Sequence, residues 1–414
     1  MKPRRVVVTG IGAVTPIGHG KSGLWDGAAS ARSGIRTITR FDHSELKAKS
    51  AGEIDDFDPL DHFDAKFARR MDPFAQYALA ASDMAIRDAG LPHDVGRPNP
   101  RVGVTMGTAL GGMASAEKQH AKFINGGIRA VDPSLALIVF GGSGSSNVAI
   151  RYGFTGPSNA NSNSCSSGTI AIGEGFRYIR DGYADAMIAC GAEAPLFGLT
   201  YSAFAIIRAM SINPDPSQAC RPFDKNRDGF VMAEGAATLV LEELEHARYR
   251  DAPIYCEIAG YSCSNDGFHM TAPRPDGDCA ARTMSDALSH AHLRPGDIGY
   301  INAHASSTPL NDKVETLAIK TAFGEHAKKT PISGTKSMHG HSLGASGAIE
   351  AAICAMIFEN DFLPPTISYE VPDPECDLNY LPNEGIKARV DHILTNSFGF
   401  GGINAVLVLS RCEQ

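Results

Sequence analysis

The sequence lacks long hydrophobic runs. No stretch approaches the roughly 18 consecutive apolar residues of a membrane-spanning helix, so a membrane protein is not expected. The basic start, Lys2-Pro3-Arg4-Arg5, precedes an apolar run that is too short for the core of a secretory signal. We therefore expect a cytoplasmic protein.

Paired cysteines and an excess of positive charge are also missing. The nine cysteines are odd in number, irregularly spaced and without a Cys-x-x-Cys pair. This pattern argues against a disulfide framework and the usual zinc spacings, so we expect no metal and mostly buried cysteines. The net charge of −8 argues against a nucleic-acid-binding protein.

The composition is that of a folded protein with more than one core. Hydrophobic residues make up 43% and charged residues 20% of 414 residues, a length that predicts two domains. Short β-rich runs alternate with Ala-rich helical stretches, which predicts an α/β fold. The runs are continuously apolar, so the strands should be covered on both faces. The expected strands lie near 6–8, 102–104, 187–189, 238–241, 255–258, 299–301 and 405–409.

Helical periodicity is clearest in three places. Apolar residues repeat at helical spacing from Phe74 to Ala85, from Ile172 to Ile179, and from Ile349 to Ile357, where we expect a strongly amphipathic helix. A seam at 249–253 separates an acidic-basic helix from a new strand. We therefore predict two halves, 1–252 and 253–414, with weak signs of an internal duplication.

Cys165 is the first candidate functional residue. It lies in Asn-Ser-Cys-Ser-Ser-Gly directly before the helix that contains Ile172. A thiol at a helix start is stabilised as a thiolate by the helix dipole and nearby N–H groups, so we expect a lowered pKa. Such a thiol suits attack on a thioester. Taken alone, an ordinary buried cysteine is the commoner interpretation.

Two histidines and a lysine follow in matching settings. His304 comes at the end of an expected strand, and His341 comes between Gly340 and Gly344, before the helix at 349–357. Lys336 lies five residues before His341 and is able to tune the pKa values of the histidines. Distant cysteine and histidine residues that meet only in the fold are typical of nucleophilic enzymes. In isolation, each histidine is more often structural and the lysine more often solvated.

A glycine-rich segment near the end completes the set. Asn396-Ser-Phe-Gly-Phe-Gly-Gly-Ile-Asn404 has closely spaced glycines and two aromatic residues. It predicts a strained turn whose N–H groups point into a site, or else a simple hairpin.

Taken in order, these motifs resemble the condensing enzymes of the thiolase superfamily, closest to the β-ketoacyl-[acyl-carrier-protein] synthase II type. The resemblance runs from Arg5-Val6-Val7-Val8-Thr9-Gly10 to the last strand and includes Arg221-Pro222-Phe223-Asp224. It implies an α/β fold with a duplicated αβαβα five-layer architecture, and a homodimer.

The resemblance also implies a role for each matching residue. Cys165 would accept an acyl group, His304 and His341 would act in malonyl decarboxylation, and Lys336 would tune the histidines. Phe400 would gate the site and add an oxyanion-hole N–H. Ser306 and Thr308 would contact a phosphopantetheine arm. The acyl pocket would include Leu110, Phe204, Ile206 and Ile207. The docking residues for an acyl carrier protein would be Lys66, Arg69, Arg70, Arg129 and Arg208.

The implied function is acyl transfer to Cys165, decarboxylation of malonyl carrier protein and condensation in fatty acid elongation. No cofactor is expected beyond the phosphopantetheine of the carrier protein. A ketosynthase of a type II polyketide or polyene pathway is the enzyme alternative. A non-catalytic partner resembling a chain-length factor is disfavoured, because Cys165, His304 and His341 are all present.

The sequence departs from the family pattern at several positions. His304-Ala-Ser-Ser-Thr308 replaces His-Gly-Thr-Ser-Thr, and His339 stands where a small or apolar residue is usual. Ile206 and Ile207 replace smaller residues. These changes affect the expected acyl-chain length and pathway more than the chemistry.

Overall fold

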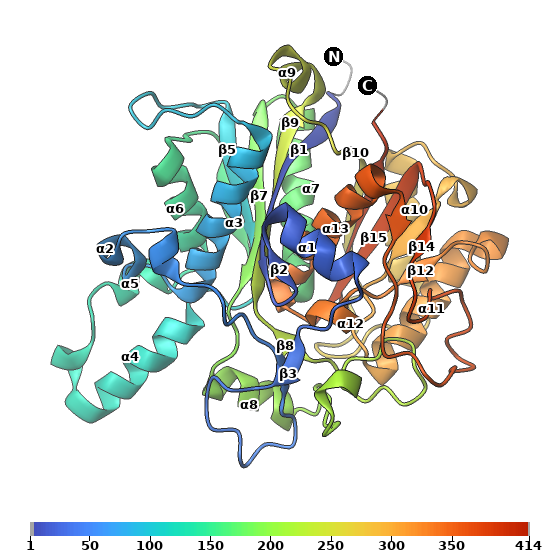
Figure 1. Cartoon of the computed structure of the whole chain (residues 1–414), viewed down its shortest axis with the longest axis horizontal. Helices are drawn as coiled ribbons and strands as arrows, with labels where there is room; N and C mark the ends of the chain where they lie inside the picture. Colours follow the sequence, from blue (N-terminus) through green and yellow to red (C-terminus); the bar gives the residue numbers. More distant parts are fainter. Residues whose placement is uncertain (1–3, 413–414) are drawn as a thin grey trace.

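The computed structural model describes residues 4–412, which form alternating layers of helices and strands (Figure 1). Within these residues, one 11-stranded mixed sheet dominates, and all but one of its strands follow a single path. Along that path the strands are β12 (Ile332–Ser333), β11 (Tyr300–Asn302), β15 (His392–Gly399), β16 (Ile403–Ser410), β10 (Cys256–Asn265), β1 (Val6–Thr15), β9 (Gly235–Glu243), β7 (Ala186–Glu193), β5 (Val102–Gly107) and β6 (Ser158–Asn161). Strand β2 (Gly18–His19) pairs with β1.

The strand order has an internal symmetry. From β1 outward it reads β9, β7, β5, β6, and from β10 outward it reads β16, β15, β11, β12. The last three strands are parallel on each side, and the inner pairs are antiparallel. The strand order is therefore the same in both directions from the β1–β10 pair.

Two helices lie between the two halves of the sheet. α7 (Ser167–Arg180) packs on β7, β5 and β16, and α13 (Ser346–Asn360) packs on β9 and β15 (Figure 1). α3 (Pro73–Ala89) with α6 (Gly142–Tyr152), and α10 (Asp278–His290) with α11 (Pro309–Phe323), cover the outer faces. These layers are those of the thiolase-like fold.

The continuous apolar strands are covered on both faces, as predicted. Every residue of β1 and β7 is buried. Gly10 on β1 allows close approach of α3, because a Cβ there would lie 2.2 Å from the Ala85 carbonyl oxygen.

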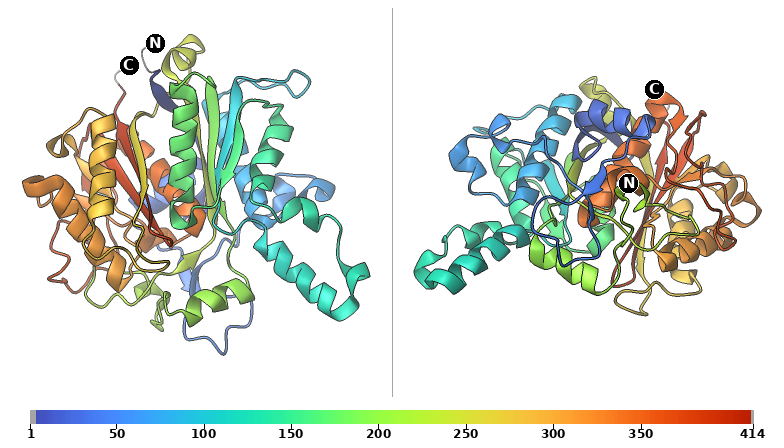
Figure 2. Two further views of the ribbon diagram at one scale, coloured as in Figure 1. Left: turned by 180° about the vertical axis from the view of Figure 1, so that it is seen from behind. Right: turned by 60° about the horizontal axis from the view of Figure 1, so that its bottom comes forward.

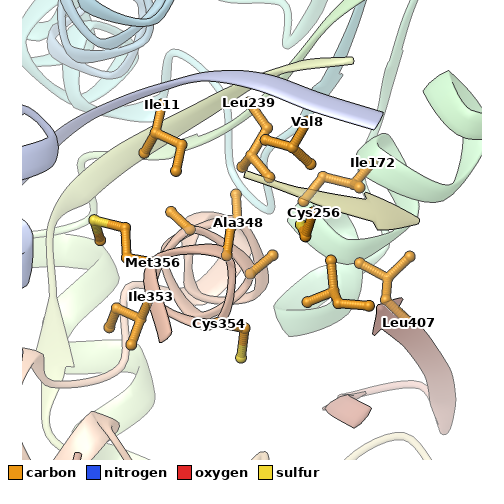
Figure 3. Close-up of a cluster of buried hydrophobic side chains, with 14 of the residues drawn as sticks. Val8, Ile11, Ile172, Leu239, Cys256, Ala348, Ile353, Cys354, Met356 and Leu407 are labelled. Carbon is orange, nitrogen blue, oxygen red and sulfur yellow. The ribbon is translucent and has the colours of Figure 1, made fainter. Parts of the chain in front are cut away.

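The helix expected near 349–357 forms, but it is not amphipathic. α13 is buried on all sides from Ser346 to Phe358 (Figure 3). The amphipathic prediction was wrong because α13 runs through the middle layer, where apolar side chains from both halves of the sheet surround it.

The remaining elements extend from these layers. α4 (Met113–Gly126) projects from one side of the body (Figure 2). The other helices are α1 (Gly20–Ala29), α2 (Ala65–Ala68), α5 (Leu135–Ile138), α8 (Gly198–Ile206), α9 (Leu244–Tyr249) and α12 (Lys336–His339). The minor strands are β3 (Ile35–Thr37), β4 (Ser50–Gly52), β8 (Met232–Ala233), β13 (Phe362–Leu363) and β14 (Ile386–Lys387).

None of the helices between residues 4 and 412 combines the length and the apolar composition needed to cross a bilayer.

Candidate active site

A cavity of about 500 Å³ brings together the four segments singled out by the sequence. Cys165, His304, His341 and Phe400 all line it, although they come from separate elements. Cys165 lies in a 3-10 turn (Ser164–Ser166) before α7, and His304 follows β11. His341 precedes a second 3-10 turn (Leu343–Ala345), which leads into α13. Phe400 lies in the turn between β15 and β16.

The Cys165 turn is held in an unusual backbone conformation. Ser164 has a φ of 54°, in the left-handed region, and its carbonyl accepts a 2.7 Å hydrogen bond from the Ser167 hydroxyl. The turn before α13 repeats this feature, with Leu343 at a φ of 41°. A 3-10 turn with one left-handed residue therefore precedes both central helices, and the first of these turns places Cys165 at the cavity.

The expected lowering of the Cys165 pKa is not found. Burial raises the pKa of the thiol, because a desolvated thiolate is disfavoured. Hydrogen bonds from Ser164 and from the Phe400 backbone N–H, together with the positive charge of Lys336, oppose this rise. The prediction was wrong because it counted the helix terminus but not the desolvation of a side chain that is only 7% exposed.

His304 is fixed through its backbone. The N–H groups of His304 and Ala305 donate to the two carboxylate oxygens of Glu315, at 2.7 and 2.8 Å. The imidazole centroid lies 5.4 Å from that of His341, with the rings nearly perpendicular. The two imidazoles are therefore neighbours in one cavity.

Lys336 is fully buried beneath the histidines. Its ammonium lies 2.6 Å from the His304 carbonyl oxygen, 2.5 Å from Glu350 Oε1 and 3.3 Å from His304 Nδ1. Three acceptors match the three donors of an ammonium group. If Lys336 donates to Nδ1, the proton of a neutral His304 ring lies on Nε2.

His341 has a hydroxyl partner where His304 has an ammonium. Its Nδ1 lies 2.9 Å from Ser346 Oγ at the start of α13, and the Phe230 ring packs edge-on against it at 5.3 Å. The pKa of each imidazole lies well below its usual range, first through burial and then through the charge of Lys336. Both rings are therefore neutral at physiological pH.

Glu350 completes the charge balance under the site. Burial raises its pKa to about 7, although Lys336 acts in the opposite direction. Among the described residues its second carboxylate oxygen, Oε2, has no hydrogen-bond partner.

The glycine-rich segment is both a hairpin and a wall of the cavity. The Phe400 ring stacks on Phe204, with centroids 6.2 Å apart. Gly401 and Gly402 have φ values of 83° and 72°, a region that glycine tolerates and most residues do not. The Gly401 N–H donates to the Met270 carbonyl at 2.7 Å, which joins the turn to the opposite loop. The structure combines the two interpretations that the sequence left open.

The other predicted site residues divide into two groups. Those that line the cavity are Leu110, Phe204, Ile207, Arg208, Ser306 and Thr308. Ile206 does not line it: α8 ends at this residue, and its side chain is 75% exposed. Ile206 and Ile207 point in different directions at this helix end, and the acyl-pocket role of Ile206 stays a prediction.

Four of the five predicted docking residues lie outside the cavity, and the fifth, Arg208, lines it. Lys66, Arg69, Arg70 and Arg129 are all exposed. Their placement leaves them available to a partner, and the docking role stays a prediction.

Two departures from the family pattern have a visible setting. Ala305 adopts a φ of 45°, which a glycine would adopt without strain. His339 is fully buried, its Nε2 lies 3.2 Å from Thr335 Oγ1, and burial lowers its pKa to about 3. His339 is therefore a neutral core residue, and it does not line the cavity.

Sequence reasoning missed the buried carboxylates around the site. Glu193, Glu315 and Glu350 are all at most 1% exposed, and each binds a segment that carries a cavity residue or Lys336. For Glu193 and Glu350 the only signal was the presence of an acid within an otherwise apolar element, and for Glu315, in a helix with other charged residues, there was none. In the described part of the chain, no cluster of His, Cys, Asp and Glu is arranged to hold a metal ion.

Comparison with known proteins identifies the family. The model of the β-ketoacyl synthase N-terminal domain matches residues 3–247, and that of the C-terminal domain matches residues 255–370. The chain belongs to the β-ketoacyl synthase family. It is thus an acyltransferase of the condensing type, as the ordered motifs predicted.

Full-length relatives agree with this assignment. A 3-oxoacyl-[acyl-carrier-protein] synthase 2 from Synechocystis sp. is 46% identical over 414 residues, covering 100% of this chain and 99% of the relative. The protein of the same name from Staphylococcus aureus is 44% identical over 410 residues, covering 99% of each chain.

Solved structures confirm the fold. A β-ketoacyl synthase from Burkholderia phymatum superimposes with a TM-score of 0.92 at 35% identity, over 99% of this chain and 100% of the other. A type II polyketide ketosynthase, solved in complex with its acyl carrier protein, gives a TM-score of 0.91 at 35% identity over the whole of both chains.

Proposed function

We propose that the protein extends acyl chains carried on an acyl carrier protein, as a 3-oxoacyl-[acyl-carrier-protein] synthase of fatty acid elongation. The supporting observation is one cavity that holds a buried cysteine and two neutral histidines, with Lys336 beside the Nδ1 of one and Ser346 beside the Nδ1 of the other. This arrangement suits a reaction that needs a sulfur nucleophile and two hydrogen-bond donors.

The first stage is transfer of the acyl group to Cys165. The sulfur attacks the thioester carbonyl, the acyl–sulfur bond to the carrier breaks, and the thiol proton passes to the departing pantetheine sulfur. We assign the backbone N–H groups of Cys165 and Phe400 to the oxyanion of the tetrahedral intermediate. Because Phe400 already donates toward the sulfur, little movement is needed.

The second stage is loss of CO2 from malonyl carrier protein. We assign the Nε2–H groups of His304 and His341 to the malonyl thioester oxygen, which becomes an enolate as the carboxylate leaves. Each positioned donor contributes about 3–4 kcal/mol to such a step. The enolate carbon then attacks acyl-Cys165, and the thiolate leaves as the 3-oxoacyl product forms.

Lys336 acts through His304 rather than on the substrate. Its ammonium lies beside Nδ1, which directs the ring proton to Nε2, and its charge adds to the effect of burial in keeping both rings neutral. A neutral donor is preferable here, because a cationic ring would also stabilise the malonyl carboxylate and oppose the loss of CO2.

The substrate is expected to enter on the arm of its carrier. Ser306 and Thr308 lie at the cavity, with their hydroxyls 3.0 Å apart, and we assign them to the phosphopantetheine arm. Leu110, Phe204 and Ile207 would contact the acyl chain. Carrier proteins are acidic, and we assign their docking to the exposed basic residues Lys66, Arg69, Arg70, Arg129 and Arg208. The phosphopantetheine belongs to the carrier, and no resident cofactor is proposed.

The assembly and location are part of the same proposal. We propose a homodimer that works in the cytoplasm, with each chain divided into halves 1–252 and 253–414. Strand β10, which begins at Cys256, opens the second half.

A type II polyketide or polyene ketosynthase is the second candidate. It is favoured by the close structural match to a ketosynthase of a type II polyketide system and by a match to the ishigamide ketosynthase/chain length factor at a TM-score of 0.92. A non-catalytic role is disfavoured, because Cys165 and both histidines are present.

The two pathways are distinguished by chain-length profiling. The purified protein is given malonyl carrier protein and a series of saturated acyl carrier proteins from butyryl to octadecanoyl. A fatty-acid synthase releases one 3-oxoacyl product of defined length from each accepted primer after one extension. Repeated extension of the unreduced product would instead indicate a polyketide ketosynthase, and no condensation with any primer would contradict both.

A further inference from the structure

Glu193 is a buried carboxylate with an unusually complete set of donors. It is the last residue of β7 and is fully buried. The backbone N–H groups of Ala109 and Leu110 donate to it at 2.6 and 3.1 Å, and the Thr108 hydroxyl donates at 3.0 Å. A fourth donor, the Gly344 N–H at 3.0 Å, comes from the other half of the chain. All four donors have acceptors on this one side chain.

The two segments that Glu193 joins each form part of the cavity wall. Ala109 and Leu110 line the cavity in one segment, and Leu343, the neighbour of Gly344, lines it in the other together with His341. The room around Glu193 is small, because a Cβ at Gly344 would lie 2.7 Å from its carboxylate and 2.5 Å from the Ala109 nitrogen. A shift of the carboxylate would therefore move both segments.

The helix that follows the Cys165 turn packs against the same Gly344 segment. The Gly168 Cα position in α7 is packed so that a Cβ there would lie 2.9 Å from the Gly344 carbonyl oxygen. After burial, which has the largest effect on the pKa of the Cys165 thiol, the charge of Lys336 lowers that pKa and the charge of Glu193 raises it. The carboxylate therefore lies where the cysteine, the acyl wall and the histidine segment converge.

We infer that Glu193 is a positioning residue for the condensation. It sets the distance between Cys165 and the cavity wall that Leu110 and Leu343 form, and this distance determines which acyl chains fit. This inference rests on the proposed function, since it assumes that Cys165 carries the acyl group. Glu315 makes a similar pair of contacts in the second half, where it binds the N–H groups of His304 and Ala305. Each half thus has a buried glutamate that accepts two successive N–H groups beside the cavity.

The test is Glu193→Gln. The amide presents an NH2 group to one of the N–H donors, so that at least one of the two segments must move. We expect the rate of acyl transfer to Cys165 to fall about 100-fold, as for a small misplacement of reacting groups, with unequal losses across the acyl-length series. Burial raises the pKa of Glu193 to about 7, so above that pH the substitution removes a negative charge near the thiol. Alkylation of Cys165 by iodoacetamide should therefore begin at lower pH than in the wild type.

Glu53→Gln is the matched control. Glu53 is also buried and accepts the N–H groups of Thr39 and Arg40 and the Thr39 hydroxyl, but it does not line the cavity. This variant should lose stability and keep both the acyl-length profile and the alkylation profile of the wild type. A Glu193→Gln protein with a uniform loss at all lengths and an unchanged alkylation profile would be behaving like the control, and the inference would be overturned.

Thr108→Val covers the case in which Glu193→Gln does not fold. It keeps the carboxylate and removes one donor, and it should change the acyl-length profile to a smaller extent. An unchanged profile in this folded variant would also refute the positioning role. If the wild-type protein condenses no primer at all, the proposed function fails first, and the outcome is distinguishable from a failure of the Glu193 inference.

Discussion

The histidines assigned to the substrate are held by residues outside the reaction. Lys336 lies beside Nδ1 of His304 and Ser346 beside Nδ1 of His341, while Glu315 accepts the backbone N–H of His304. These partners lie between 5 and 32 positions away along the chain. Local sequence context predicted the rings, because His304 follows an expected strand and His341 follows Gly340, whereas the role of the lysine came from the family resemblance. Local context did not predict the carboxylates, since an acid within an apolar stretch has no spacing that reveals its partner.

Lys336→Met tests this dependence. Loss of the ammonium leaves His304 Nδ1 without its donor, so decarboxylation of malonyl carrier protein should fall about 100-fold, comparable to the loss of an oxyanion-hole donor. Burial and, after it, the positive charge of Lys336 lower the pKa of His304. Without that charge the pKa rises toward its usual value, and the decline in rate on acidification should begin at higher pH than in the wild type.

Lys313→Met is the control for loss of a lysine. Lys313 is half-exposed and pairs with Glu375 on the surface. This variant should decarboxylate at the wild-type rate with the wild-type pH profile. Equal pH profiles for Lys336→Met and the wild type would contradict the role assigned to the ammonium.

At the scale of elements, the sequence predicted which segments are helices and strands but not how each helix is covered. The apolar residues of α13 repeat as on an amphipathic helix, yet the positions between them are Ala348, Ala351 and Cys354, which are small enough to be buried too. Periodicity does not distinguish a surface helix from a central one when the second face is small rather than charged. The contact between α7 and α13 was therefore out of reach of the sequence.

Gly168→Ala tests the contact between these two helices. A Cβ at Gly168 would lie 2.8 Å from the Ala348 nitrogen and 2.9 Å from the Gly344 carbonyl oxygen, so backbone must move. Overpacking should lower the free energy of unfolding by about 1–3 kcal/mol. Alanine gains about 1 kcal/mol by helix propensity, which offsets part of this loss, and we expect a net destabilisation. Chemical denaturation measures the change.

Gly175→Ala on the same helix is the comparison. A Cβ at Gly175 would meet side-chain atoms of Leu241 and Thr105 at 3.2 Å, which yield more easily than backbone. Its cost should be the smaller of the two. A Gly168→Ala protein at least as stable as Gly175→Ala would contradict the packing described here.

At the scale of the whole molecule, one cavity is built from residues of both halves of the chain, around the sheet and the central helices α7 and α13. The sequence indicated the duplication only weakly, because the repeated unit is a strand order and a strained turn rather than a repeated motif. The basic residues assigned to docking lie on the surface of a chain whose net charge is −8. Local charge, and not the total, is expected to decide how an acidic carrier protein approaches.

Reversal of Arg69 and Arg70 to Glu tests that approach. KM for the acyl carrier protein should rise about 10-fold with little change in kcat, because two favourable surface interactions become repulsive. Added salt should reduce the difference from the wild type. Reversal of the exposed Arg294 and Arg389 in the second half is the matched control, and an equal rise in KM for that pair would remove the patch from the proposal.

The most direct test of the central claim follows the covalent state of Cys165. The wild-type protein and Cys165→Ala are each mixed with acyl carrier protein and then with malonyl carrier protein, and intact masses and products are measured. We expect the wild type to gain one acyl group at Cys165, to lose it when malonyl carrier protein is added, and to release the 3-oxoacyl product. Cys165→Ala should gain no acyl group and make no such product, while it still decarboxylates malonyl carrier protein through His304 and His341. Condensation by Cys165→Ala, or an acyl group found on another residue of the wild type, would contradict the account.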